Sequence, residues 1–332
     1  MTAAAARRAP TGSGLSTKPW WPWLRRGATL VFFGLVAWLL VHQARAIDWQ
    51  EVLTALRAYP PLVLAGAVVL AALSFTLYSC FDLVGRYYTG HSLRTLPVML
   101  VTFISYVFNL NLGSLVGGVA FRYRLYSRLQ LDTGTITRVM SLSMLTNWSG
   151  YLLLGGLIFA FATPGLPPSW KIDSVGLQVL GFVLLAVVSA YLLLCHFSRQ
   201  RSVSLRGHRI ELPSGRLALL QVTMGAANWL IMSGLMYVLL LQKIALPTVA
   251  GVLLVAAVAG VLTHVPAGLG VLEAVFVALL SHQMPAPALL AGLVAYRVIY
   301  YLVPLLLATL LYLVTEARAK RLAKTAGAQP RA

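Results

Sequence analysis

Long apolar runs, each about as long as a bilayer crossing, constrain this sequence more than any other feature. Uninterrupted runs occupy residues 27–43, 62–84, 138–162, 175–197, 217–241 and 288–314. About 20 mostly apolar residues form a helix that crosses a hydrocarbon core of about 30 Å. Only 10% of the residues are charged, whereas a soluble domain carries about 25%. The chain is therefore predicted to be an integral membrane protein, which excludes a soluble enzyme and a secreted disulfide scaffold.

Two further apolar stretches, residues 96–129 and 247–283, are interrupted near the middle. Glycine loses the most entropy in a helix and proline lacks a backbone donor, so such residues predict helix breaks. Unwound backbone at membrane depth survives only where protein or a water-filled cavity covers it. We therefore expect each stretch to form a re-entrant hairpin of broken helices. The residues at the two breaks include Asn109, Asn111, Ser114, Gly117, Gly118, Pro266, Gly268 and Gly270.

The basic residues test this arrangement, because inner-membrane proteins keep Lys and Arg mainly on the cytoplasmic side. With the N-terminus inside and both interrupted stretches re-entrant, most of the 26 Lys and Arg residues lie inside. The exceptions are Arg45, Arg57, Lys171 and Lys243, which lie outside, and Arg297, which lies within a span. If residues 96–129 crossed once instead, four arginines would move outside. The charge distribution thus favours hairpins and cytoplasmic termini.

The predicted fold class is an all-α polytopic membrane protein with six spanning helices plus two re-entrant broken-helix hairpins in inverted repeats. The transmembrane domain is expected at residues 27–315, between cytoplasmic tails at residues 1–26 and 316–332. The first run, 27–43, has a basic flank and loosely resembles a signal peptide. An arginine at its cleavage-like end, Ala44-Arg-Ala46, favours an uncleaved anchor.

The map implies an internal repeat of opposite orientation, at about residues 62–162 and 217–314. Each unit has a span, a hairpin and a second span, and the two hairpins enter from opposite sides. A shift of 151 residues places Gly117 on Gly268 and Arg122 on Glu273. Paired broken helices in inverted repeats indicate a transporter's binding site near the midplane.

Charged side chains at membrane depth are costly, about 2.5–3.5 kcal/mol each at a helix centre, and often functional. Glu273 and Arg297 lie at compatible depths for a pair, which either fixes the hairpin or gates a path. Arg122 starts a descending half-helix. Asp82, near the end of its span, is expected to snorkel or to pair with a loop. Arg124 and Arg128 are interpreted as interfacial arginines.

The half-helix N-termini offer free N–H groups and positive dipole ends, which suit a phosphate. Asn109, Asn111 and Ser114 either add neutral donors to such a site or satisfy the broken backbone. No nucleotide-binding loop, nucleophile elbow or metal spacing is found, so no cofactor or metal is expected. The net charge of +18 is spread between the apolar runs, so no nucleic-acid partner is expected.

Three motifs at these same positions resemble the lysylphosphatidylglycerol synthase transmembrane-region family. They are NLNLGSLVGGVAFRYRLYSR at residues 109–128, HVPAGLGVLEA at 264–274 and AYRVIYYLVP at 295–304, and the resemblance covers roughly residues 60–315. It implies a polytopic fold that moves phospholipids, anionic or aminoacylated, between leaflets. The site positions that it implies are Gly117, Gly118, Arg122, Gly268, Gly270, Glu273, Arg297 and Tyr300.

The full-length synthases of this family continue into an aminoacyltransferase domain, which does not follow here. We therefore expect no lipid aminoacylation and no enzyme activity. The leading hypothesis is a lipid translocase (flippase or scramblase) of the bacterial inner membrane whose partners are membrane lipids. The alternatives are a membrane partner that supports a lipid-modifying enzyme and a secondary transporter of a small anion.

Overall fold

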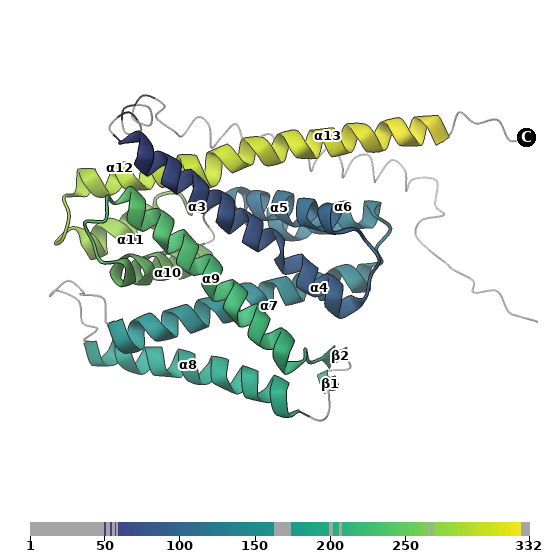
Figure 1. Ribbon diagram of the computed structural model, residues 1–332, viewed down its shortest axis with the longest axis horizontal. Helices are drawn as coiled ribbons and strands as arrows, with labels where there is room; N and C mark the ends of the chain where they lie inside the picture. Colours follow the sequence, from purple (N-terminus) through teal and green to yellow (C-terminus); the bar gives the residue numbers. More distant parts are fainter. Residues whose placement is uncertain are drawn as a thin grey trace, which may run out of the picture. The chain divides into compact units, whose positions relative to one another are not determined.

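In the computed structural model, the long apolar runs of the described chain form helices (Figure 1). The structure describes residues 59–162, 174–198, 202–205, 208–263, 265 and 268–326, together with Gln50, Thr54 and Arg57. The predicted span at 27–43, the N-terminal tail and Pro266 lie outside these residues.

The described part of the chain consists mainly of helices. They are α3 (Pro61–Ser79), α4 (Phe81–Thr89), α5 (Thr95–Leu112), α6 (Phe121–Arg128), α7 (Thr133–Leu157), α8 (Ser174–Phe197), α9 (Gly215–Leu239), α10 (Leu246–Thr263), α11 (Val271–Leu280), α12 (Ala286–Arg297) and α13 (Val303–Ala326). Short π-helical segments, η2 (Ser114–Ala120), η3 (Ile158–Ala162) and η5 (Val298–Leu302), adjoin α6, α7 and α12. Strands β1 (Ser202–Leu205) and β2 (His208–Glu211) form an antiparallel pair between α8 and α9.

The all-helical polytopic class is confirmed. Seven helical segments of the described chain are long and apolar enough to cross a bilayer: Pro61–Thr89, Thr95–Leu112, Thr133–Ala162, Val175–Phe197, Gly215–Leu239, Leu246–Thr263 and Ala286–Ala317. Five of them correspond to predicted spans. The other two are α5 and α10, the first arms of the two interrupted stretches. At 1.5 Å per residue, 18 residues reach about 27 Å, so re-entrance of these arms stays a prediction.

The first interrupted stretch folds back on itself at Gly113. This residue has a φ of 85° and ends α5, after which η2 and α6 return along it. Gly117 and Gly118, predicted as part of the break, lie instead within η2. A Cβ on Gly117 would lie 2.1 Å from the Phe108 carbonyl. The prediction of a break at these two glycines is therefore wrong, because their small size serves close packing of the two arms.

The second interrupted stretch also folds back, and here the predicted glycines do break the helix. Gly268 and Gly270 have φ values of 56° and 77°, in the left-handed region that favours glycine. Helix α11 starts at Val271, directly after the turn, and packs against α10 and α12.

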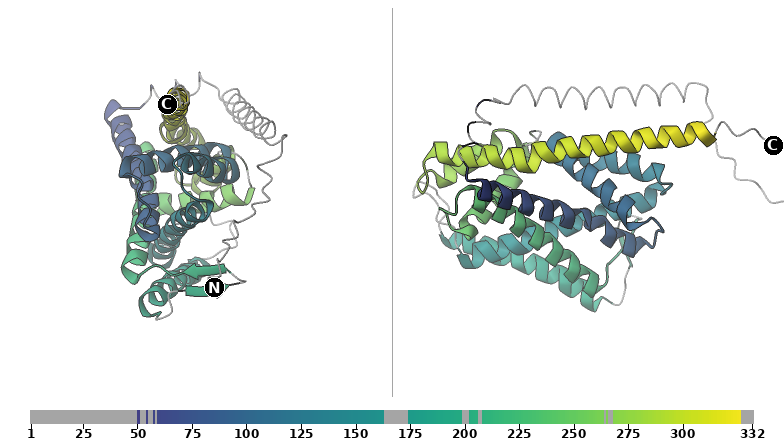
Figure 2. Two further views of the ribbon diagram at one scale, coloured as in Figure 1. Left: turned by 90° about the vertical axis from the view of Figure 1, so that its right-hand side faces the viewer. Right: turned by 45° about the horizontal axis from the view of Figure 1, so that its top comes forward.

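The segments that are predicted to form two repeats, at about residues 62–162 and 217–314, pack against each other. Helix α9, which opens the second repeat, packs against both α3 and α7 of the first (Figures 1 and 2). Gly150 of α7 faces Gly225 of α9 so closely that a Cβ there would lie 2.0 Å from the Gly225 backbone. Helix α13 of the second repeat likewise packs against α5. Residues from both repeats can therefore meet in one core.

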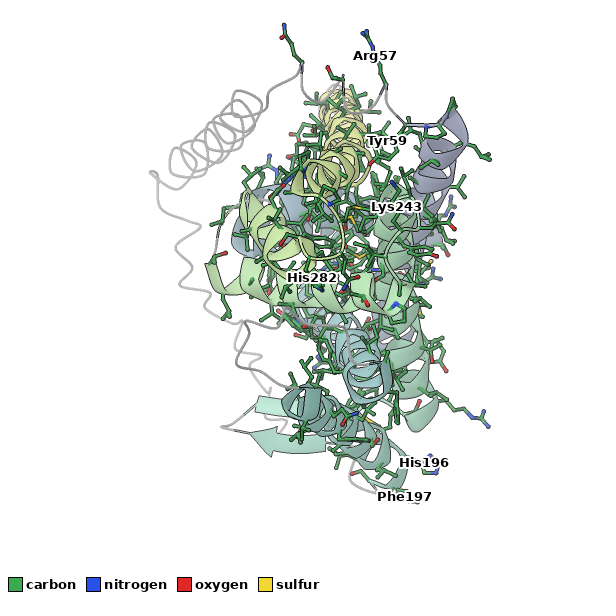
Figure 3. All side chains as sticks on the ribbon, turned by 90° about the vertical axis from the view of Figure 1, so that its left-hand side faces the viewer. Arg57, Tyr59, His196, Phe197, Lys243 and His282 are labelled. Carbon is green, nitrogen blue, oxygen red and sulfur yellow. The ribbon has the colours of Figure 1, made fainter. Side chains whose placement is uncertain are left out.

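The start of α3 and the end of α9 lie together at one end of the helices. The Tyr59 hydroxyl, just before α3, donates to the Leu239 carbonyl at the end of α9 over 2.8 Å. Figure 3 labels Tyr59 together with Arg57 and Lys243, the two described basic residues that are predicted to lie outside. Thus the start of α3 and the end of α9 share one side, as the topology requires.

Candidate functional site: two ion pairs joined by a polar cluster

Asp82 and Arg122 form a buried ion pair between α4 and α6. Arg122 Nη2 lies 3.2 Å from Asp82 Oδ1, and the two side chains are 4% and 0% exposed, arginine first. Arg122 Nη2 also donates to Ser143 Oγ of α7 over 3.1 Å. The Tyr126 hydroxyl donates to Asp82 Oδ2 over 2.8 Å. Three elements of the first repeat therefore meet at this pair.

This geometry corrects the expectation for Asp82, which neither snorkels nor pairs with a loop. The span that was predicted to end at residue 84 is longer, because α3 and α4 together form one helical segment that ends at Thr89. Asp82 is therefore inside the helix. One sequence signal could have found it: Arg122 needs an acidic partner, and the whole chain holds only 8 Asp and Glu residues.

Glu273 and Arg297 form a second ion pair, between α11 and the end of α12. Arg297 Nε lies 2.5 Å from Glu273 Oε1, and Nη2 lies 2.9 Å from Oε2, so the contact is bidentate. Nη2 also donates to the Gly268 carbonyl over 3.0 Å. The arginine thus binds both the carboxylate and the backbone of the broken helix. The pair is more accessible than the first, with side chains 14% and 23% exposed, arginine first.

A central polar cluster of Ser74, Tyr106, Asn228 and Tyr300 is buried between the two repeats. Ser74 Oγ donates to Asn228 Oδ1 over 2.8 Å and lies 2.8 Å from the Tyr300 hydroxyl. The Tyr300 and Tyr106 hydroxyls lie 3.3 Å apart. Tyr300 is fully buried, so in this conformation its hydroxyl contacts protein and not lipid.

Aromatic rings extend this cluster toward both ion pairs. The Tyr78 ring stacks on Tyr106 with centroids 3.4 Å apart, and Tyr78 interacts electrostatically with Arg122. On the other side the Tyr301 ring centroid lies 6.1 Å from that of Tyr300, and the Arg297 guanidinium lies 5.7 Å from the Tyr301 centroid. Aromatic residues therefore lie between the central polar cluster and each ion pair.

The neutral polar residues of the first hairpin have separate places. Asn111 Nδ2 donates to the Val107 carbonyl one turn earlier in α5 over 2.9 Å. Asn109 Oδ1 lies where it would contact a Cβ on Gly118, 2.9 Å away. Ser114 is exposed at the turn. Among the described residues, the ion-pair and hydrogen-bond partners found for Arg122 are Asp82 and Ser143.

Arg124 and Arg128 are not simply interfacial, because both lie beside Glu316 of α13. Arg128 makes a bidentate contact, in which its Nη2 lies 2.9 Å from Glu316 Oε1. Arg124 Nη2 lies 3.9 Å from the same oxygen. These contacts fasten the end of the first hairpin to the last helix. Among the described residues, no group of His, Cys, Asp and Glu side chains has a metal-binding arrangement.

The fold and this site define a class of protein: a polytopic helical membrane protein whose two helical hairpins each carry a partly or fully buried ion pair. The family model of the lysylphosphatidylglycerol synthase transmembrane region matches residues 27–308. The chain belongs to this family.

Relatives of known name agree with that assignment. The chain is 46% identical to the inner membrane protein YbhN of Escherichia coli (strain K12) over 305 residues, which are 92% of this chain and 96% of YbhN. It is 32% identical over 260 residues to the uncharacterized protein slr0712 of Synechocystis, with 77% and 80% covered. A phosphatidylglycerol lysyltransferase of Staphylococcus haemolyticus is 25% identical over 295 residues, 86% of this chain but 33% of that protein. The chain is thus a multi-pass inner-membrane protein related to a lipid-modifying enzyme.

Proposed function

We propose that the protein is a lipid translocase, a flippase or scramblase that moves a phospholipid between leaflets. The observation that carries this proposal is the pair of hairpin ion pairs, Asp82–Arg122 and Glu273–Arg297. Charges at membrane depth are costly and are characteristically retained along substrate pathways. The family's link to phospholipid chemistry supports a lipid as the substrate.

The proposed path runs between the two arginines. A lipid phosphate can replace the Asp82 carboxylate as the partner of Arg122, because a guanidinium binds both anions through the same N–H groups. The headgroup then moves past the central polar cluster toward Arg297, while the acyl chains stay in apolar surroundings. An anionic or an aminoacylated headgroup carries the required phosphate.

The Glu273–Arg297 pair is the proposed gate. Separating it frees the Gly268 carbonyl and the turn that precedes α11, since Arg297 binds both. The sequence contains no nucleotide-binding loop, so transport is passive or coupled to an ion. If a proton drives it, Glu273 is the proposed carrier, because protonation removes the charge that holds Arg297.

A flip assay tests the proposal. Purified protein is reconstituted into liposomes that contain fluorescent lipids with several headgroups, and an impermeant quencher reports the outer leaflet. Wild type is compared with two neutral pairs, Asp82→Asn/Arg122→Gln and Glu273→Gln/Arg297→Gln, which leave no unpaired charge. The matched control, Arg128→Gln/Glu316→Gln, neutralises an ion pair at the far end of the hairpin.

We expect wild type and the control to accelerate lipid movement, and both hairpin pairs to lose this acceleration. Wild-type movement no faster than in protein-free vesicles, with or without a pH gradient, would contradict the proposal. In that case uptake of a small anion into sealed vesicles would favour the soluble-anion transporter. A lack of both activities would favour the membrane partner, a role suggested by the lysyltransferase relative.

A further inference from the structure

A lateral groove lies between α3, α5 and the start of α13. Its volume is 400 Å³, within the range of about 300–1,000 Å³ that is typical of small-molecule sites. The wall is apolar apart from Thr76 and Ser79. Its lining residues include Val68, Ala72, Phe75, Met99, Phe103 and Leu307.

The dimensions of the groove match one half of a bilayer. It follows α3 from Val68 to Ser79, which corresponds to about 16 Å at 1.5 Å per residue. One leaflet accounts for half of a hydrocarbon core of about 30 Å. A single extended hydrocarbon chain therefore fits along it.

The rim of the groove is open while its floor borders the central polar cluster. Val68, Leu96 and Leu307 at the rim are 54%, 66% and 51% exposed. On the floor, the Phe75 ring lies 4.8 Å from the Tyr300 ring and 5.6 Å from that of Tyr106, centroid to centroid. Only the Phe75 ring thus separates an acyl chain in the groove from the central polar cluster.

A cationic mouth adjoins one end of the groove. Arg86 Nη1 donates to Thr95 Oγ1 over 2.9 Å, and Thr95 directly precedes the lining residue Leu96. Arg94 is the N-cap of α5, a helix of 18 residues. The N–H groups of Thr95 and Leu96 carry partial positive charge and add to that of the two arginines. Pro97 has no N–H, and that of Val98 donates to the Arg94 carbonyl.

We propose that this groove holds one acyl chain of a phospholipid whose phosphate lies at the mouth formed by Arg86, Arg94 and the start of α5. The inference rests on the proposed function, since it gives the translocated lipid a lateral entry site. It also gives one of the two acyl chains a defined place in the apolar surroundings. The occupant is a lipid because the wall is apolar, the exposed rim belongs to candidate membrane-spanning helices and the mouth is cationic.

Photo-crosslinking tests the groove directly. The full-length protein is reconstituted with phosphatidylglycerol that carries a diazirine midway along one acyl chain, and the labelled residues are mapped by mass spectrometry. Ala72 lines the groove and is exposed, whereas its neighbour Leu73 is 50% exposed but does not line it. The test variant is therefore Ala72→Trp and the matched control is Leu73→Trp.

We expect labels in wild type and Leu73→Trp to concentrate on Phe75, Met99 and Phe103. In Ala72→Trp we expect these labels to be lost, together with the acceleration of lipid movement. If Ala72→Trp fails to fold by size-exclusion chromatography, Met99→Trp takes its place. A diazirine diacylglycerol, which lacks the phosphate, is expected to label the groove less, and Arg86→Gln should remove that difference.

Two results separate this inference from the proposed function. Equal labelling of groove residues and outward-facing residues such as Leu73, in a protein that moves lipid, would overturn the groove and leave the translocase standing. Groove labels that Ala72→Trp removes, in a protein that moves no lipid, would support the groove as a lipid site and overturn the translocase.

Discussion

Arg122 of α6 and Asp82 of α4 lie 3.2 Å apart, and their side chains are 4% and 0% exposed. They are 40 residues apart in sequence, and in the core Tyr126 bonds to Asp82 while Ser143 bonds to Arg122. Removal of one partner from such a pair leaves an uncompensated buried charge, whereas removal of both does not. The pair therefore links α6 of the first hairpin to α4. Substitution of only one of the two residues cannot preserve this interaction.

The single variant Asp82→Asn should be severely destabilised, by about 3–5 kcal/mol, because Arg122 remains buried and charged. The double variant Asp82→Asn/Arg122→Gln should recover most of this loss. Thermal unfolding of the detergent-solubilised variants, arranged as a double-mutant cycle, measures the difference. Equal stability of the single and the double variant would show that Arg122 finds another partner.

The length of the apolar run did not reveal the burial of Asp82, because this run ends before the helix does. The predicted span stopped at residue 84, yet the helical segment continues to Thr89. By contrast, Glu273 and Arg297 could be predicted as a pair, since each lies at a definite depth beside a marked break. The depth of a charged residue in the membrane can thus be predicted from the sequence only where the end of its helix is correctly predicted.

The glycines of the first hairpin have two roles that the sequence does not distinguish. Glycine at membrane depth either breaks a helix or lets another backbone approach it, and composition does not distinguish the two roles. Gly113 breaks the helix with a φ of 85°, while Gly117 permits a close approach. The polar cluster around Tyr300 could not be predicted for a different reason. It forms only where α3 and α5 of the first predicted repeat meet α9 of the second.

Gly117→Ala should weaken the first hairpin, because the new Cβ would lie 2.1 Å from the backbone of Phe108. Overpacking of this kind typically costs about 1–3 kcal/mol. The matched control is Gly234→Ala in α9, where a Cβ meets nothing within 4 Å. The thermal unfolding temperature should fall for Gly117→Ala and should not fall for Gly234→Ala. A Gly117→Ala protein as stable as the control would mean that the arms can separate freely.

Tyr300→Phe should destabilise the interface between the repeats, because it leaves Ser74 and Tyr106 without their shared hydroxyl partner. A buried polar group that loses its partner costs about 1–3 kcal/mol. Tyr87→Phe is the control, since Tyr87 is 79% exposed. The free energy of unfolding, measured by denaturant titration in one detergent, should fall for the first variant alone.

Glu273→Gln is expected to abolish any dependence of lipid movement on a pH gradient. The glutamine cannot take up a proton, and it cannot neutralise Arg297, so the gate is permanently unpaired. Asp132→Asn is the control: Asp132 caps α7 through Thr135, hydrogen bonds from Thr135 lower the pKa of Asp132, and asparagine caps a helix equally well. The flip assay is run with the vesicle interior acidic, alkaline or matched to the outside. Wild type and Asp132→Asn should respond to the gradient in the same way. A Glu273→Gln protein that keeps the wild-type response would exclude Glu273 as the proton carrier, and the ion pair would then act only to hold Arg297 against the turn at Gly268.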